Sequence, residues 1–370
     1  MSAVEILPVL KMHIFDFNSY KTDIPNMKPF ALAFLTLLFC SCAAPKNTKI
    51  ASYSDLIDKV NNIKDSISVG KMTIHNAYKS QLLAHHNGRF DSTMILKKVY
   101  QPNKHVFDSC LSQIFGEENG KKFKPEGLYM WNRKLLAENE FLIRQKLAVL
   151  DSVNVDQLFT KHLNALQKIT GQQGEGKWLV YFGPKGLQIF GGCDNNAMIL
   201  DMFGSDWTTQ SIDKVFAHEL EHLIFNPILE KDPNGRTGLG ITLDEGLAVY
   251  FTSLYLNQSQ EEALYGKNTQ ILLDREKEIF EKLEPYFYKT NEEGCPIFRH
   301  CGRNSDCKPV VEGLPKEAEN ELCYFLGFRI IQHYVAQNGK DSWKDIYTIP
   351  LKDFFEKSGY KEFLRSKRGN

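Results

Sequence analysis

The chain has 370 residues, of which 42% are hydrophobic and 24% charged, and its 45 Lys and Arg side chains balance 45 Asp and Glu side chains. This length suits two or three domains, or one large domain with attached helices, and it allows a substantial core. The composition excludes a disordered chain of low hydrophobicity, and the charge balance argues against a nucleic-acid partner, which selects a basic surface.

The first recognisable element is the apolar run FALAFLTLLFC at residues 30–40. Eleven residues are too few to cross a hydrocarbon core of about 30 Å as a helix, but they fit the apolar region of a signal peptide. Small residues follow, and the stretch around Cys42 resembles a bacterial lipoprotein box, with Cys40 as the second candidate. We therefore expect a signal region at 1–41, a true start near residue 27 and lipidation of Cys42. A buried apolar helix is the alternative.

Lipidation would leave residues 42–370 tethered to a membrane by fatty chains. We therefore expect the protein in the envelope of a bacterium, on a periplasmic or surface face. That compartment permits disulfides, and six cysteines remain beyond the signal region: Cys110, Cys193, Cys295, Cys301, Cys307 and Cys323. In the loop expected at 291–313, the regular spacing of three cysteines matches no common zinc site, so disulfides are favoured over a second metal site using His300.

After a linker at 42–52, residues 53–173 are expected to form a helical N-terminal region of about five helices, because apolar residues recur three and four positions apart. The pattern then changes to compact apolar runs that predict three strands, at 178–182, 186–191 and 197–203. We expect a core domain at 174–260 and a helical C-terminal region at 261–370. The predicted fold is α+β, largely helical, with a small mixed sheet packed on the helix that follows it.

That helix, expected from Ser211 to Phe225, contains the sequence HELEH. Because residues four apart lie on one helix face, the imidazoles of His218 and His222 can reach the same Zn²⁺ ion. Glu219 lies at the rim of that face, where it can act as a general base on water. The Asn-Pro pair at 226–227 is expected to end the helix. The alternative is a solvated helix that carries two histidines by coincidence.

A catalytic zinc needs a third protein ligand and one open position. The sequence DEGLAVYF lies downstream, and its Glu245 comes 23 positions after His222. We expect a loop that contains Gly238 to Gly240, and then a second apolar helix that begins near Glu245 and runs to about Leu256. Glu245 is the expected third ligand. The alternative is a solvated carboxylate in the first turn of that helix, where the helix dipole favours it.

HELEH followed by DEGLAVYF resembles the gluzincin metallopeptidases, the thermolysin-like clan in which two histidines and a glutamate bind zinc. The metzincin pattern is excluded, because it requires Gly and His where this chain has Phe225 and Ile228. Within the clan, the chain is most similar to predicted bacterial zinc-dependent protease lipoproteins related to gliding-motility lipoproteins. The likeness spans residues 177–256 and the sequence YFLG at 324–327.

This resemblance implies a membrane-anchored zinc peptidase acting on peptide or protein substrates, with residues 195–201 as the edge strand along which a substrate backbone lies. Thermolysin-like enzymes carry an Asp four residues after the glutamate ligand, to orient a histidine, and this chain has Val249 there. Asp244 is the candidate for that support. The sequence predicts no particular protein partner.

An oxyanion formed during hydrolysis needs a hydrogen-bond donor. Tyr324, which lies in a Y-x-x-G pattern on an expected helix, is the first candidate, and His333 and Tyr334 are the next. Two other functions remain open. A catalytically silent envelope lipoprotein could use the same fold in gliding or secretion machinery, and the missing Asp favours it mildly. A purely structural zinc site is less favoured, because such sites usually close all four positions with Cys or His.

Overall fold

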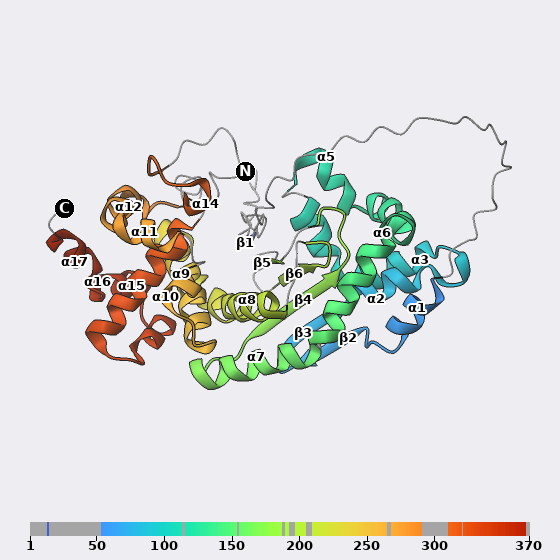
Figure 1. The fold of residues 1–370 in the computed structure, drawn as a ribbon, viewed down its shortest axis with the longest axis horizontal. Coiled ribbons are helices and arrows are strands. Elements are labelled where there is room, and N and C mark those ends of the chain that lie inside the picture. The colour runs from blue at the N-terminus through green and yellow to red at the C-terminus, as the bar shows by residue number, and fades with distance from the viewer. Residues whose placement is uncertain are drawn as a thin grey trace, which may run out of the picture.

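A computed structural model of the chain describes residues 13–14, 53–112, 115–153, 155–186, 189–191, 197–204, 209–264, 268–290, 310–319 and 321–367. Both lipidation candidates, residues 192–196 between two of the expected strands, and the cysteines of the expected 291–313 loop lie outside these residues. The described part confirms the predicted α+β class, since helices surround one small mixed sheet (Figure 1).

The sheet has the strand order β1-β5-β6-β4-β3-β2. Its strands are β1 (His13–Ile14), β2 (Ser66–Val69), β3 (Lys71–Asn76), β4 (Glu175–Tyr181), β5 (Ile189–Gly191) and β6 (Ala197–Asp201). The central strand β4 pairs in parallel with β3 and β6, whereas the remaining pairs are antiparallel. A strand with parallel neighbours on both sides is normally covered on both faces, and β4 is accordingly apolar along its second half.

Alternate residues of β4 enter two different cores, as the two-residue period of a strand requires. Trp178 and Val180 belong to the larger core, which includes the helix that carries HELEH. Leu179 and Tyr181 belong to a smaller core on the opposite face, together with Phe107. The sheet therefore separates the HELEH helix from the helical segments that carry Ile95, Phe107 and Phe123.

The helical region expected at 53–173 also contains a hairpin of β2 and β3, which the sequence pattern did not predict. Gly70 makes the turn with φ +58°, a conformation that glycine adopts without steric strain. Met72 and Ile74 are fully buried and alternate with more exposed residues. The hairpin forms because β3 pairs with β4 across 104 positions of sequence, at Lys71 and Glu175, a contact that local helical periodicity does not reveal.

The strand expected to be the substrate-binding edge, at 195–201, is an interior strand. β6 pairs with β4 on one side and with β5 on the other, and β1 follows β5. The resemblance placed this strand at the edge, whereas β1 and β2 are the two edge strands among the described residues. β6 also ends earlier than expected, at Asp201, whose carboxylate accepts hydrogen bonds from the backbone N–H groups of Gly183 and Phe203.

The helices that precede β4 are α1 (Ser54–Asn61), α2 (Ala77–Leu83), α3 (Ser92–Met94), α5 (Gly116–Gly120), α6 (Pro125–Val153) and α7 (Val155–Thr170), with short π-helical segments at Ile95–Tyr100 and Val106–Leu111. Most of them gather at one end of the sheet, whereas α6 and α7 run along it (Figure 1). At the other end are α9 (Gly238–Tyr255), α10 (Gln260–Ala263), α11 (Thr269–Asp274), α12 (Glu276–Leu283), α14 (Lys316–Glu319), α15 (Leu322–Asn338), the 3₁₀ segment η8 (Ser342–Tyr347), α16 (Leu351–Lys357) and α17 (Tyr360–Ser366). Between the two groups lies α8 (Thr209–Leu229).

The two helices of the expected site have different bounds from those predicted. α8 continues through Pro227 to Leu229. A proline in the last turn removes one N–H from the helix, but the Glu230 N–H still donates to the Asn226 carbonyl at 3.0 Å and closes that turn. α9 begins at Gly238, so the glycines expected in a loop form its first turn, capped by the Thr237 hydroxyl.

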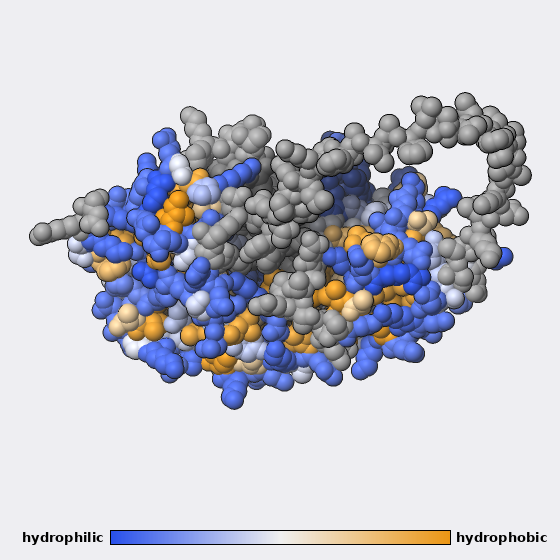
Figure 2. All heavy atoms as spheres, viewed as in Figure 1, coloured by the Kyte–Doolittle hydropathy of each residue, from blue (hydrophilic) through white to orange (hydrophobic). Residues whose placement is uncertain are grey.

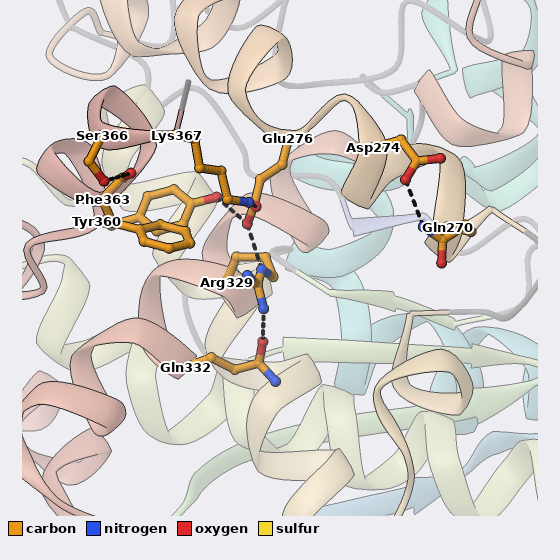
Figure 3. Close-up of polar contacts among 9 residues, drawn as sticks. All are labelled: Gln270, Asp274, Glu276, Arg329, Gln332, Tyr360, Phe363, Ser366 and Lys367. Atoms are coloured by element: carbon orange, nitrogen blue, oxygen red, sulfur yellow. Dashed lines mark hydrogen bonds and ion pairs between the residues drawn. The ribbon is translucent and has the colours of Figure 1, made fainter. Parts of the chain in front are cut away.

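The C-terminal helices are joined by an ionic cluster around Glu276 of α12, which is only 1% exposed (Figure 3). Its carboxylate pairs with Arg329 of α15 and with Lys367, each at 2.6 Å, and accepts a hydrogen bond from the Tyr360 hydroxyl of α17 at 3.0 Å. Buried carboxylates are stable only when paired in this way. The cluster therefore fixes the order in which these helices pack.

The visible face of the molecule is mostly hydrophilic, with hydrophobic residues in small separate groups (Figure 2). Within the described ranges, we find no helix with the length and apolar character needed to span a bilayer. Of the six cysteines beyond the expected signal region, the structure describes Cys110, which is disulfide-bonded, and Cys323, which is buried.

Candidate metal centre

The apolar side of α8, the helix that contains HELEH, is fixed in place by aromatic packing. The ring of Phe216 lies 4.6 Å from that of Phe159 on α7 and 5.3 Å from that of Trp178 on β4, measured between centroids. All three side chains are fully buried. The histidines that follow Phe216 are therefore held by the larger core rather than by an exposed helix surface.

Three potential ligand atoms converge beside α8. The Nε2 atoms of His218 and His222 are 3.1 Å apart, and Glu245 Oε2 lies 3.5 Å from the first and 3.4 Å from the second. A tetrahedral zinc with bonds of about 2.0–2.1 Å places its ligand atoms about 3.3 Å apart. The three separations thus match three corners of a zinc tetrahedron, and the three residues form a possible metal-binding group.

The same three side chains are buried, at 2%, 0% and 4% exposure for His218, His222 and Glu245. This burial contradicts the two alternatives that assign these residues to solvent, namely a solvated pair of histidines and a solvated carboxylate. Glu245 is also the eighth residue of α9 rather than a first-turn residue, so the helix dipole does not explain it.

Two glycines set the distance between α9 and α15. A Cβ atom on Gly246 would lie 2.2 Å from the backbone of Gly327, and one on Gly327 would lie 1.9 Å from the Thr242 carbonyl oxygen. The helices therefore cross with backbone against backbone. This contact places Glu245, beside Gly246, and Tyr324, one turn before Gly327, at the same site.

The carboxylate of Asp244 contacts the other side of His222. Its Oδ1 lies 2.9 Å from Nδ1 of the imidazole, and both side chains are fully buried. Burial lowers the pKa of His222, but the carboxylates of Asp244 and Glu245 outweigh this effect and raise the pKa well above its ordinary value. Val249, at the position where thermolysin-like enzymes have their Asp, is buried in the larger core.

Glu219 has a carboxyl group with both oxygens buried and with no hydrogen-bond partner among the described residues. Burial raises its pKa to about 8, although His222 acts in the opposite direction. An unsatisfied buried carboxyl group is costly to a fold and commonly marks a functional site. This one follows His218 directly in sequence, at the position expected for a general base.

The donor set fits a divalent cation. Glu219, Asp244 and Glu245 are each at most 4% exposed, and they accompany two buried histidines. Buried carboxylates are unfavourable unless a cation or hydrogen bonds compensate them. A Zn²⁺ ion shared by His218, His222 and Glu245 would supply that compensation with ligand types that zinc prefers.

The structure separates the three oxyanion candidates. The ring of Tyr324 stacks on His218, with centroids 6.1 Å apart, and its side chain is 9% exposed. His333 instead bonds the Ser358 carbonyl at 2.6 Å and packs on Phe363. The Tyr334 hydroxyl donates to Asp345 at 2.8 Å. We therefore assign packing roles to His333 and Tyr334, and of the three candidates Tyr324 is the one that lies beside a candidate metal ligand.

One buried pair was not anticipated from the sequence. The hydroxyl of Tyr347, on η8, donates to Glu221 Oε1 at 3.0 Å, across 126 positions of sequence. Burial raises the pKa of Glu221 to about 8. The signal for such a contact was a charged residue within the apolar run at 220–225, because a buried charge requires a partner. The local sequence did not predict that Tyr347 is this partner.

Residues 183–356 match a protein family described as predicted Zn-dependent protease (DUF2268). The matched segment contains α8, α9 and α15, and hence every residue of the candidate metal centre. Searches among curated proteins and among solved structures gave no match.

Proposed function

We propose that this protein is a membrane-anchored zinc-dependent peptidase that hydrolyses peptide bonds in peptide or protein substrates. One observation carries the proposal. Three buried ligand atoms lie 3.1 to 3.5 Å from one another, and an unsatisfied carboxyl group follows the first ligand in sequence. The match to a family of predicted zinc-dependent proteases supports the same reading.

The chain would hold zinc through His218, His222 and Glu245, with one coordination position open. When bound, zinc supplies Lewis acidity that polarises a carbonyl group and lowers the pKa of water to about 7. Glu219 would accept a proton from the attacking water and return it to the leaving amine. Its hydrogen-bond capacity is not used by any described residue, as a group that exchanges protons with water and substrate requires.

Tyr324 is the proposed donor to the oxyanion, because its ring stacks on a ligand and its hydroxyl group can donate one hydrogen bond. The ligand set of two histidines and a glutamate from the next helix supports assignment to the gluzincin type. The silent-scaffold alternative drew its support from Val249 in place of an Asp. That support weakens, since Asp244 provides a buried carboxylate to His222 from elsewhere.

The test of this function combines metal analysis with proteolysis. We expect one zinc per chain in the purified protein, loss of that zinc in His222→Ala, and retention of it in Glu219→Gln. Cleavage of a denatured, fluorescently labelled casein should disappear in both variants. A folded protein that takes up no zinc would refute the proposal, and zinc binding without cleavage of any peptide would support the scaffold alternative.

We further propose that Cys42 carries a lipid anchor and that the protein resides in the bacterial envelope. The disulfide at Cys110 supports an oxidising compartment. Mass spectrometry of the N-terminal peptide should detect an acylated Cys42, and Cys42→Ala should release the protein from membranes. A mature chain that retains residues 1–41 would contradict this proposal.

A further inference from the structure

His222 is held on both of its nitrogens by consecutive residues of one helix. Glu245 Oε2 lies 3.4 Å from Nε2, and Asp244 Oδ1 lies 2.9 Å from Nδ1. Successive side chains of a helix point about 100° apart, since 3.6 residues make a turn. α9 therefore runs beside the imidazole so that one side chain reaches its metal-facing nitrogen and the preceding side chain reaches its rear nitrogen.

We propose that Asp244 is the positioning residue of the metal centre. Its carboxylate accepts a hydrogen bond from the Nδ1–H group of His222, which directs the lone pair of Nε2 at the metal and holds the ring in one orientation. A carboxylate behind a metal-binding histidine fixes the tautomer and strengthens the ligand. This inference rests on the proposed function, because it presumes that His222 binds a metal.

A purely structural role for Asp244 accounts poorly for its surroundings. The side chain is fully buried, and α9 is buried along almost its whole length. An apolar residue there would avoid the cost of desolvating a carboxylate, and buried ion pairs are weak contributors to stability. The 2.9 Å contact between Asp244 Oδ1 and Nδ1 of His222, a candidate metal ligand, accounts for a buried carboxylate at this position, whereas packing does not.

The same contact explains why Val249 is compatible with a metal centre. In the thermolysin-like pattern the orienting carboxylate lies one helical turn after the glutamate ligand. Here that turn is apolar, and Val249 belongs to the larger core. The carboxylate lies one residue before the ligand instead, where the direction of α9 brings it to His222.

The test uses the full chain and three variants: Asp244→Ala, Asp244→Asn and the control Glu221→Gln. Glu221 is as buried as Asp244 and adjoins His222 in sequence, but the contact described for it is with the Tyr347 hydroxyl. The zinc dissociation constant is measured by competition with a chromogenic chelator. The absorption spectrum of the Co²⁺-loaded protein reports the geometry of the ligands, and the Tm of the metal-free protein reports folding.

We expect Asp244→Ala to weaken zinc binding about 10- to 100-fold and to alter the Co²⁺ spectrum, in line with the usual effect of removing a group behind a ligand. Asp244→Asn keeps an acceptor oxygen but loses the charge, so its effect should be smaller, about 3- to 10-fold. Glu221→Gln should leave the dissociation constant within about threefold.

Wild-type zinc affinity and an unchanged Co²⁺ spectrum in folded Asp244 variants would overturn the proposal while leaving the metal site intact. If Asp244→Ala does not fold, Asp244→Asn decides by the same two readouts. An equal loss of affinity in Glu221→Gln would also overturn it, because the effect would then be one of buried charge in general. If the wild-type protein binds no zinc, the proposed function fails with it, and the two failures are therefore distinguishable.

Discussion

Replacing Gly327 by alanine tests whether the α9–α15 crossing sets the geometry of the metal centre. The added Cβ would lie 1.9 Å from the Thr242 carbonyl oxygen and 2.8 Å from Gly246 Cα, whereas ordinary contacts begin near 3.4 Å. Because both obstructing atoms are backbone, they cannot rotate away. The two helices would have to separate by about 1.5 Å, the difference between the ordinary and the imposed distance.

This displacement has two expected consequences. Overpacking a core costs about 1–3 kcal/mol, and a clash with backbone belongs at the upper end. At roughly 2 °C per kcal/mol for a large domain, the Tm should fall by about 6 °C. Glu245 adjoins Gly246, and a metal site tolerates ligand shifts of only about 0.2 Å. Zinc content should therefore fall more sharply than stability.

The assay is differential scanning calorimetry of the metal-free protein, together with zinc analysis after reconstitution. Gly174→Ala is the matched control, because its Cβ would lie 3.4 Å from Leu163 Cδ2 and 3.5 Å from Ile224 Cγ1, which are ordinary contacts. The control should keep the wild-type Tm and zinc content. A Gly327→Ala protein that binds zinc as the wild type does would refute the idea that this crossing positions Glu245.

Three further predictions concern charge and metal. Removing zinc with a chelator should lower the Tm, and re-addition should restore it, because a ligand bound only to the folded state stabilises that state; an unchanged Tm would mean that no metal is bound. Burial lowers the pKa of His162, which is fully buried, to about 4, although Asp213 acts against this. The unfolded chain, with a pKa near 6.5, then binds more protons, so stability is lost as pH falls from about 6.5 to 4. His162→Gln should remove about 3 kcal/mol of that loss, measured by urea unfolding at pH 7 and pH 4, and an identical pH slope in both proteins would contradict the prediction. Glu276→Gln should cost about 1–3 kcal/mol, less than a fully buried ion pair, because Arg329 and Lys367 are partly exposed and can rehydrate. Urea unfolding measures it, and Gln270→Ala, a change in an exposed pair with Asp274, is the control that should have no effect (Figure 3).

The elements that local sequence determined are those with a strong period or a short spacing. The apolar run 178–182 predicted β4, because a buried strand in a parallel sheet is apolar on both faces. The spacing of His218 and His222 placed both rings on one face of α8, because the helix repeat brings residues four apart together. Glu245 could be named as a third ligand from the acidic start of the downstream apolar run, but only the tertiary structure gave its distance from the histidines.

Other features depended on contacts between segments far apart in sequence. The β2–β3 hairpin joins the sheet through β4, and the interior position of β6 follows from its pairing with both β4 and β5. Neither is visible in a local window, because strand order depends on which distant partners supply hydrogen bonds. The segment 53–173 therefore showed its helices but not its hairpin.

The sequence by itself determined the chemistry that this protein has available, and the tertiary structure decided how it is arranged. Tyr324, His333 and Tyr334 all lie on α15, and their residue types alone did not distinguish them. The crossing at Gly327 turns Tyr324 toward His218, whereas the other two face Ser358 and Asp345. The packing of α9 against α8 brings Asp244 and Glu245 to opposite sides of His222. Helix periodicity fixes which residues share a face, but only the packing of one helix against another decides what that face meets.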